Sequence, residues 1–140
     1  MRAAQLFCIF ASAFLPFSPS AYADPAKPRI TPPYSMEEIY VRAEALKTIL
    51  LQKFPDDTVA MLELSNKAAE FRGYVAGTID QQEIDDPVLV ECTRRHTLQA
   101  IAGRTAAVLT SIPLDRSKAA GLGVLLAIHY ACNDLKKKPI

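Results

Sequence analysis

Apolar residues recur at steps of three and four along most of the chain after residue 34, a spacing that places them on one face of a helix. Ser35 and Glu38 have the spacing of a capping box, so we expect a helix to begin at Ser35. Pro55 ends this region, and Asp56 or Asp57 can cap a second helix. The apolar positions are Met36, Ile39, Tyr40, Ala43, Leu46 and Leu50 in the first helix, and Met61, Leu64, Ala68, Phe71, Val75 and Ile79 in the second. Both patterns predict amphipathic helices with one buried face.

The second half of the chain continues the helical pattern. Residues 88–95 predict a helical turn, and Thr97 starts a helix that Pro113 ends. Asp115 is expected to cap the last helix, and residues 119–132 are so apolar that we expect them to be mostly buried. We find neither strand alternation nor hairpin turn pairs. We therefore predict an all-α domain over residues 35–140, a small bundle of four or five helices.

Small residues form a second stripe on the helix that carries Phe71. Ala69, Gly73 and Gly77 follow one another at steps of four. Small side chains at this spacing allow another helix to approach closely. We therefore expect packing within the chain along this stripe, and Gly73→Leu should destabilise the fold by about 1–3 kcal/mol through a packing clash.

The segment DQQEIDDP, residues 80–87, combines four carboxylates with a proline. We expect the preceding helix to fade into an acidic loop here, and a solvated loop is the ordinary interpretation of such a segment. The alternative is a docking element for a basic partner surface. Its candidate contact residues are Asp80, Glu83, Asp85 and Asp86.

The N-terminus is typical of an export signal. Arg2 is followed by an apolar run, and residues 21–23 form an A-x-A cleavage site. We expect residues 1–23 to be a signal peptide and the proline-rich residues 24–34 to be an extended lead-in. The expected protein is therefore periplasmic, with no membrane contact after cleavage.

The charge argues against one class of partner. The chain has 16 Lys and Arg and 15 Asp and Glu, and one of the 16, Arg2, lies in the expected signal peptide. A mature domain with balanced charge is not expected to bind nucleic acid, because that binding depends on clusters of Lys and Arg. We also find no glycine-rich phosphate loop and no paired-carboxylate motif. We expect no enzymatic activity and no cofactor.

The segments ECTRRH (91–96) and HYACN (129–133) hold both histidines and two of the three cysteines. The last two helices should form an antiparallel hairpin, in which residues whose numbers have a nearly constant sum face each other. Three pairs meet this condition: Cys92 with Cys132, His96 with His129, and Gly103 with Gly121. We expect the glycine pair to let the two helices approach closely.

Three interpretations of this group stay open: a disulfide, a Cys2His2 zinc site, and a catalytic thiol with a neighbouring base. Export favours the disulfide, because thiols oxidise outside the cytosol. A Cys92–Cys132 bond would close a loop of about 40 residues and stabilise the fold by about 4 kcal/mol on the chain-entropy estimate. We therefore predict one disulfide in the C-terminal helical hairpin, with no metal ligand and no catalytic residue.

Residues 72–80 and 90–132 resemble the Rap/Tai group of periplasmic immunity proteins. The matching positions are Gly73, Tyr74, Val75 and Gly77, then Cys92, Thr97 and Ile101, and finally Pro113 and Cys132. The resemblance implies a small exported helical protein that neutralises a peptidoglycan amidase toxin of type VI secretion. It also implies a homodimer that covers the toxin's active cleft through an inserted loop, for which residues 80–86 are our candidate.

Two alternatives stay open beside this resemblance. The chain also resembles acid-activated periplasmic chaperones of the HdeA type, which share a Gly-(Trp/Tyr)-Val-x-Gly segment followed by a cysteine. Those chaperones have their first cysteine near the mature N-terminus, whereas this chain has none between Asp24 and Cys92, which favours the immunity pattern. The other alternative is a structural adaptor that uses the same scaffold for a different target.

The disulfide leads to a direct test. Non-reduced mature protein should contain no free thiol, because both of its cysteines would be bonded to each other. A thiol titration of the denatured, non-reduced protein checks this expectation. Two free thiols, or a bound zinc ion, would contradict the disulfide.

Overall fold

The computed structural model describes residues 34–113, 115–116 and 119–137. The expected signal peptide, and the expected lead-in up to Pro33, lie outside these residues. The elements are α1 (Met36–Leu50), α2 (Thr58–Gln82), the 3-10 helix η1 (Glu83–Asp85), α3 (Pro87–Arg95), α4 (Leu98–Ser111) and α5 (Ala120–Lys137). The prediction of an all-α bundle is confirmed.

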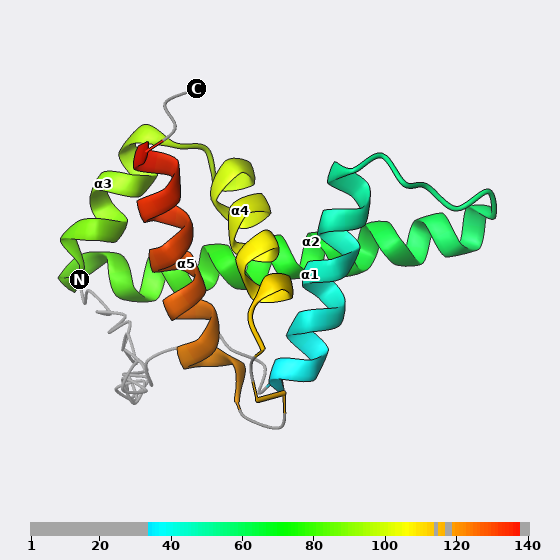
Figure 1. Ribbon diagram of the computed structural model, residues 1–140, viewed down its shortest axis with the longest axis horizontal. Coiled ribbons are helices and arrows are strands. Elements are labelled where there is room, and N and C mark those ends of the chain that lie inside the picture. The colour runs from blue at the N-terminus through cyan, green and yellow to red at the C-terminus, as the bar shows by residue number, and fades with distance from the viewer. Residues whose placement is uncertain (1–33, 114, 117–118, 138–140) are drawn as a thin grey trace, which may run out of the picture.

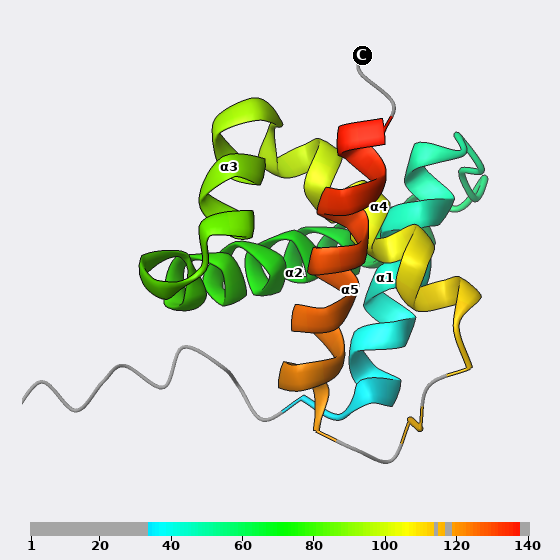
Figure 2. The ribbon, with the colours of Figure 1, turned by 60° about the vertical axis from the view of Figure 1, so that its left-hand side comes forward.

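The long helix α2 runs across α1, α4 and α5, which lie roughly side by side (Figure 1). α4 and α5 are antiparallel, and α3 lies beside the C-terminal half of α5 in both views (Figure 1 and Figure 2). Among the described residues, we find no helix whose length and apolar character would allow it to cross a membrane. The bundle therefore places the α2–α3 connection beside the middle of α5, where Asp86 contacts His129.

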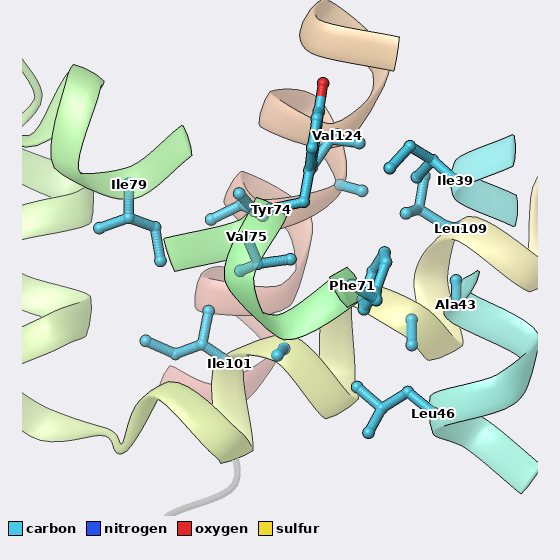
Figure 3. Packing of buried hydrophobic residues seen from close by; sticks show 14 of the residues in the cluster. Ile39, Ala43, Leu46, Phe71, Tyr74, Val75, Ile79, Ile101, Leu109 and Val124 are labelled. Carbon is cyan, nitrogen blue, oxygen red and sulfur yellow. The ribbon is translucent and has the colours of Figure 1, made fainter. Parts of the chain in front are cut away.

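The core forms where the middle of α2 meets the other helices. Phe71 is fully buried, on the side of α2 that faces Ala43 of α1 and Leu109 of α4 (Figure 3). Other fully buried large side chains are Ile39, Val75, Leu89, Ile101, Val124 and Ile128. Burying an aliphatic side chain of this size contributes about 1.5–3 kcal/mol. The two predicted apolar stripes therefore supply only part of the core, because α3, α4 and α5 contribute many of the buried side chains. Leu50 at the end of the first stripe stays 45% exposed.

Three of the predicted helix starts are confirmed. The backbone N–H of Ser35 donates to Glu38 Oε2 at 2.8 Å, and the N–H of Glu38 donates to Ser35 Oγ at 3.3 Å. The backbone hydrogen bond from Ser35 holds the pKa of the Glu38 carboxyl below its ordinary value. Asp57 and Thr97 accept hydrogen bonds from N–H groups three residues later and cap α2 and α4. The prediction for Asp115 is wrong, because α5 begins only at Ala120.

The predicted acidic loop at residues 80–87 is largely helical. α2 continues to Gln82, η1 covers Glu83–Asp85, and the expected helical turn at residues 88–95 is a complete helix, α3. Asp86 caps α3, and Pro87 occupies its first turn, where a missing N–H removes no helical hydrogen bond. Pro87 therefore starts a helix here, and the chain turns within η1.

The expected burial of residues 119–132 is only half correct. Val124, Ile128 and Ala131 are buried. The opposite side of α5 is exposed, with Leu122 at 70%, Leu126 at 51% and Tyr130 at 59%. α5 lies at the edge of the bundle, so neighbouring helices cover only one of its faces.

The expected packing along the stripe at Gly73 is wrong. Gly73 is exposed, and apart from its chain neighbours and the nearby backbone of its own helix, no atom of the described residues lies within 4 Å of the position that a Cβ atom would take. α2 buries Phe71, Tyr74 and Val75, and this face points away from Gly73. The stripe therefore allows no close helix approach at this position.

The close approaches occur instead between α1 and the last two helices. A Cβ atom on Gly103 would lie 2.9 Å from Leu50 Cδ1, and one on Gly123 would lie 2.8 Å from Met36 Sδ. A Cβ atom on Gly121 would meet no described atom within 4 Å, so Gly121 is not the close partner of Gly103. The tight contacts at glycines therefore lie where α4 and α5 approach side chains of α1, and Gly121 makes no such contact with α4.

Gly123→Leu should therefore lower the free energy of unfolding by about 1–3 kcal/mol, because Met36 is only 3% exposed and has little room to move. Gly73→Leu is the matched control. It should leave stability unchanged or raise it by up to about 1 kcal/mol, because leucine favours a helix over glycine. Urea unfolding of the oxidised proteins measures both. An equal loss in the two variants would contradict the packing at Gly123.

Candidate functional site

Cys92 and Cys132 form the predicted disulfide, with a sulfur–sulfur distance of 2.07 Å and Cα atoms 5.7 Å apart. Cys92 belongs to α3, so the bond joins α3 to the end of the hairpin that α4 and α5 form. Because the two sulfur atoms are bonded to each other, neither is a thiolate that could hold zinc or act as a nucleophile. Over the described ranges, no group of three or more His, Cys, Asp or Glu side chains is placed to hold a metal ion.

The two histidines lie in different surroundings. His129 Nε2 is 2.7 Å from Asp86 Oδ2. The other oxygen, Asp86 Oδ1, accepts hydrogen bonds from the N–H groups of Val88 at 2.9 Å and Leu89 at 3.3 Å. Asp86 therefore caps α3 and contacts α5 at the same time. His96 lines a separate pocket, and its buried Nδ1 has no hydrogen-bond partner among the described residues.

The candidate contact residues Asp80, Glu83, Asp85 and Asp86 lie where the chain turns from α2 into α3, and we call residues 80–86 the acidic corner. The fold holds two of these carboxylates. Asp86 is fixed by its contacts with α3 and α5, and Glu83 Oε1 accepts a hydrogen bond from the Thr93 hydroxyl at 2.7 Å. Asp80 and Asp85 are exposed. The acidic corner is therefore a structured surface that presents negative charge.

Ile84 occupies the middle of the acidic corner and is 88% exposed, more than any other large hydrophobic side chain of the described residues. Sequence analysis did not single it out. The available signal was an apolar residue between carboxylates, in a segment expected to be solvated. Single exposed apolar side chains are common on soluble proteins, so Ile84 is distinguished by its position among the four carboxylates of the acidic corner.

A pocket of about 250 Å³ lies beside the acidic corner, between the end of α2 and the start of α4. It is lined by Ala76, Ile79, Asp80, Glu83, Thr93, His96, Leu98 and Ile101. The two acidic residues of this lining belong to the acidic corner. The pocket therefore adjoins the acidic corner through these two residues, and Ile84 is not part of its lining.

Two further apolar surfaces are exposed. The outer face of α5 presents Leu126 and Tyr130, which line a groove of about 380 Å³ together with His129. The second surface is the arm, by which we mean the connection at residues 51–57 and the first turns of α2, which extend beyond the bundle (Figure 1). Its exposed side chains are Leu51, Phe54, Val59 and Leu62. Because several exposed apolar side chains gather on each of these segments, both are candidate interaction surfaces.

Comparison with known proteins finds no match: no protein-family model, no curated protein and no solved structure is similar to the chain.

Asp86→Ala should lower the free energy of unfolding by about 1–2 kcal/mol, because α3 loses its cap. Asp86→Asn keeps an oxygen that can cap α3 and loses only the charge opposite His129. Its free energy of unfolding should therefore decrease less than that of Asp86→Ala. Urea unfolding at pH 7 compares the two variants. An equal loss of stability in both variants would show that the cap does not contribute to stability. No loss of stability in either variant would contradict the anchoring of α3 by Asp86.

Proposed function

We propose that this protein is an exported binding protein that acts by occlusion, and that its partner is a cell-wall amidase toxin of type VI secretion. The observation that carries the proposal is Ile84, 88% exposed at the centre of the acidic corner. The class of partner follows from the resemblance of residues 72–132 to the Rap/Tai immunity proteins. The disulfide supports an oxidising compartment such as the periplasm.

The acidic corner suits a protein partner with a basic rim around an apolar depression. Ile84 would fill the depression, and the carboxylates around it would meet the basic rim. Charges of opposite sign accelerate the encounter of two proteins and fix their register, while the buried apolar residue supplies most of the affinity.

The rigidity of the acidic corner supports the same proposal. The segment is held by the disulfide between α3 and α5, by the Asp86–His129 contact, and by the hydrogen bond from Thr93 to Glu83. A surface that is ordered before binding loses less conformational entropy on association. Occlusion of an active cleft would then require no chemistry from this protein, and inhibition would be stoichiometric.

The resemblance also implies a homodimer, which stays a prediction. The arm supports it, because a second copy could cover exposed apolar side chains such as Val59 and Leu62. The arm also carries both signs of charge, Lys53 beside Asp56 and Asp57, which would allow ion pairs between two copies related by a two-fold axis.

The proposal predicts that a cell-wall hydrolase is encoded beside this protein. The test mixes the mature protein with that hydrolase and measures binding by calorimetry at pH 7. We expect a tight complex without amidase activity, and light scattering on the same sample reports whether the protein is a dimer. Ile84→Ala should weaken binding by roughly 30-fold or more, the loss typical of a central interface residue. Leu122→Ala is the matched control, because Leu122 is 70% exposed on a different face.

Two outcomes would overturn the proposal. If Leu122→Ala weakens binding and Ile84→Ala does not, the contact lies on α5 and not at the acidic corner. If the hydrolase does not bind, and the protein suppresses aggregation of unrelated proteins at roughly pH 2–3, where carboxylates are protonated, the acid-activated chaperone is correct.

A further inference from the structure

We infer that the pocket lined by Ile79, Asp80, Glu83, His96 and Ile101 receives the side chain of an arginine or lysine carried by the partner protein. The inference rests on the proposed function, since it specifies which chemical group of a partner the acidic corner would recognise. It assigns a ligand class to a pocket that plays no part in the contact made by Ile84.

The inner part of the pocket is apolar. Ile79 is 3% exposed and Ile101 is 1% exposed, so these side chains belong to the core and form a fixed floor. Ala76 and Leu98 extend this apolar lining. Arginine and lysine place a chain of methylene groups against apolar surface and keep the charged end toward water. The floor therefore matches the stem of a basic side chain.

The rim of the pocket carries two carboxylates. Asp80 and Glu83 are three residues apart across the end of α2, a spacing that places both side chains on one side of the helix. The hydrogen bond from the Thr93 hydroxyl holds one oxygen of Glu83 and so orients its carboxylate. A guanidinium group has five donors and can bond two carboxylates at once. This rim therefore matches the charged end of the same side chain.

The charge of this rim is not neutralised within the described part of the chain. Neither Asp80 nor Glu83 forms an ion pair there, and the pocket lining includes no lysine or arginine. Other carboxylates of the fold, such as Glu70 and Asp134, pair with Arg42 and Arg104. The carboxylates of Asp80 and Glu83 are therefore available to a cationic group of another molecule.

The chain has two histidines, which allow a site-specific test. His96 lines the pocket, whereas His129 lines the groove on α5. In a proton NMR titration with N-acetyl-arginine amide, the ring resonances of His96 should shift and saturate, and those of His129 should not. For a single side chain, we expect a dissociation constant on the order of millimolar. N-acetyl-norleucine amide, which has an apolar stem without the charge, should bind at least about tenfold more weakly.

The variant Asp80→Asn/Glu83→Gln should abolish the shift of His96. The Glu83→Gln substitution keeps a side-chain oxygen that can accept from Thr93, and unchanged His129 resonances would show that the fold is intact. Asp85→Asn, outside the pocket lining, is the control and should bind the probe like the original protein. Equal shifts with the norleucine probe, no saturable shift of His96, or full binding by the double variant would overturn the inference.

A failure of this inference can be distinguished from a failure of the proposed function. If the hydrolase binds the double variant as tightly as the original protein, the pocket plays no part in recognition and the proposed function stands. If His96 responds to the arginine probe and no hydrolase binds, the pocket takes a basic side chain and the proposed partner is wrong.

Discussion

The Cys92–Cys132 bond holds α3 against α5, and the candidate site depends on this bond. α3 has nine residues, of which only Leu89 and Cys92 are buried. A helix of this length is unstable in water by itself, so contacts with the rest of the fold must hold it. The disulfide fixes the middle of α3, and the Asp86–His129 contact fixes its start. Because α2 and α3 are both held, the residues between them have a defined position.

α2 connects the core with two exposed surfaces. All of its buried residues lie between Ala68 and Ile79. The turns before Ala68 extend from the bundle as the arm, and the turn after Ile79 leads into the acidic corner (Figure 1). Because the middle of the helix is packed on several sides, both of its ends are held at fixed positions. One core therefore positions a mixed-charge apolar surface at one end and an acidic surface at the other.

The near-zero net charge of the chain does not reveal how unevenly its charged residues are distributed over the surface. The acidic corner gathers four carboxylates in seven residues, whereas Lys136 and Lys137 lie at the end of α5. A partner experiences the local field, because charges further away than about 8–10 Å are screened at physiological salt. Overall charge balance is therefore compatible with an acidic binding surface.

The sequence alone determined the features that depend on neighbouring residues. Helix starts at Ser35, Asp57 and Thr97 rest on hydrogen bonds between residues three apart, and the buried stripe through Phe71 and Val75 rests on helical spacing. The pairing of the two cysteines also followed, because the expected signal peptide leaves only two in the mature chain. The prediction of a loop at residues 80–87 was wrong, and the reason is also local. Asp86 and Pro87 can start a helix as readily as they end one.

Only the tertiary structure decided which faces stay exposed. Leu122 and Val124 are similar in apolar character and two residues apart, yet Leu122 is 70% exposed and Val124 is fully buried. Gly73 and Gly123 differ in the same way. Gly73 has free space where a side chain would be, whereas Gly123 lies against Met36. Ile84 is exposed because none of the described helices covers it. The hydrophobic effect favours burial of all of these apolar side chains, but the packing of the helices leaves room for only some of them.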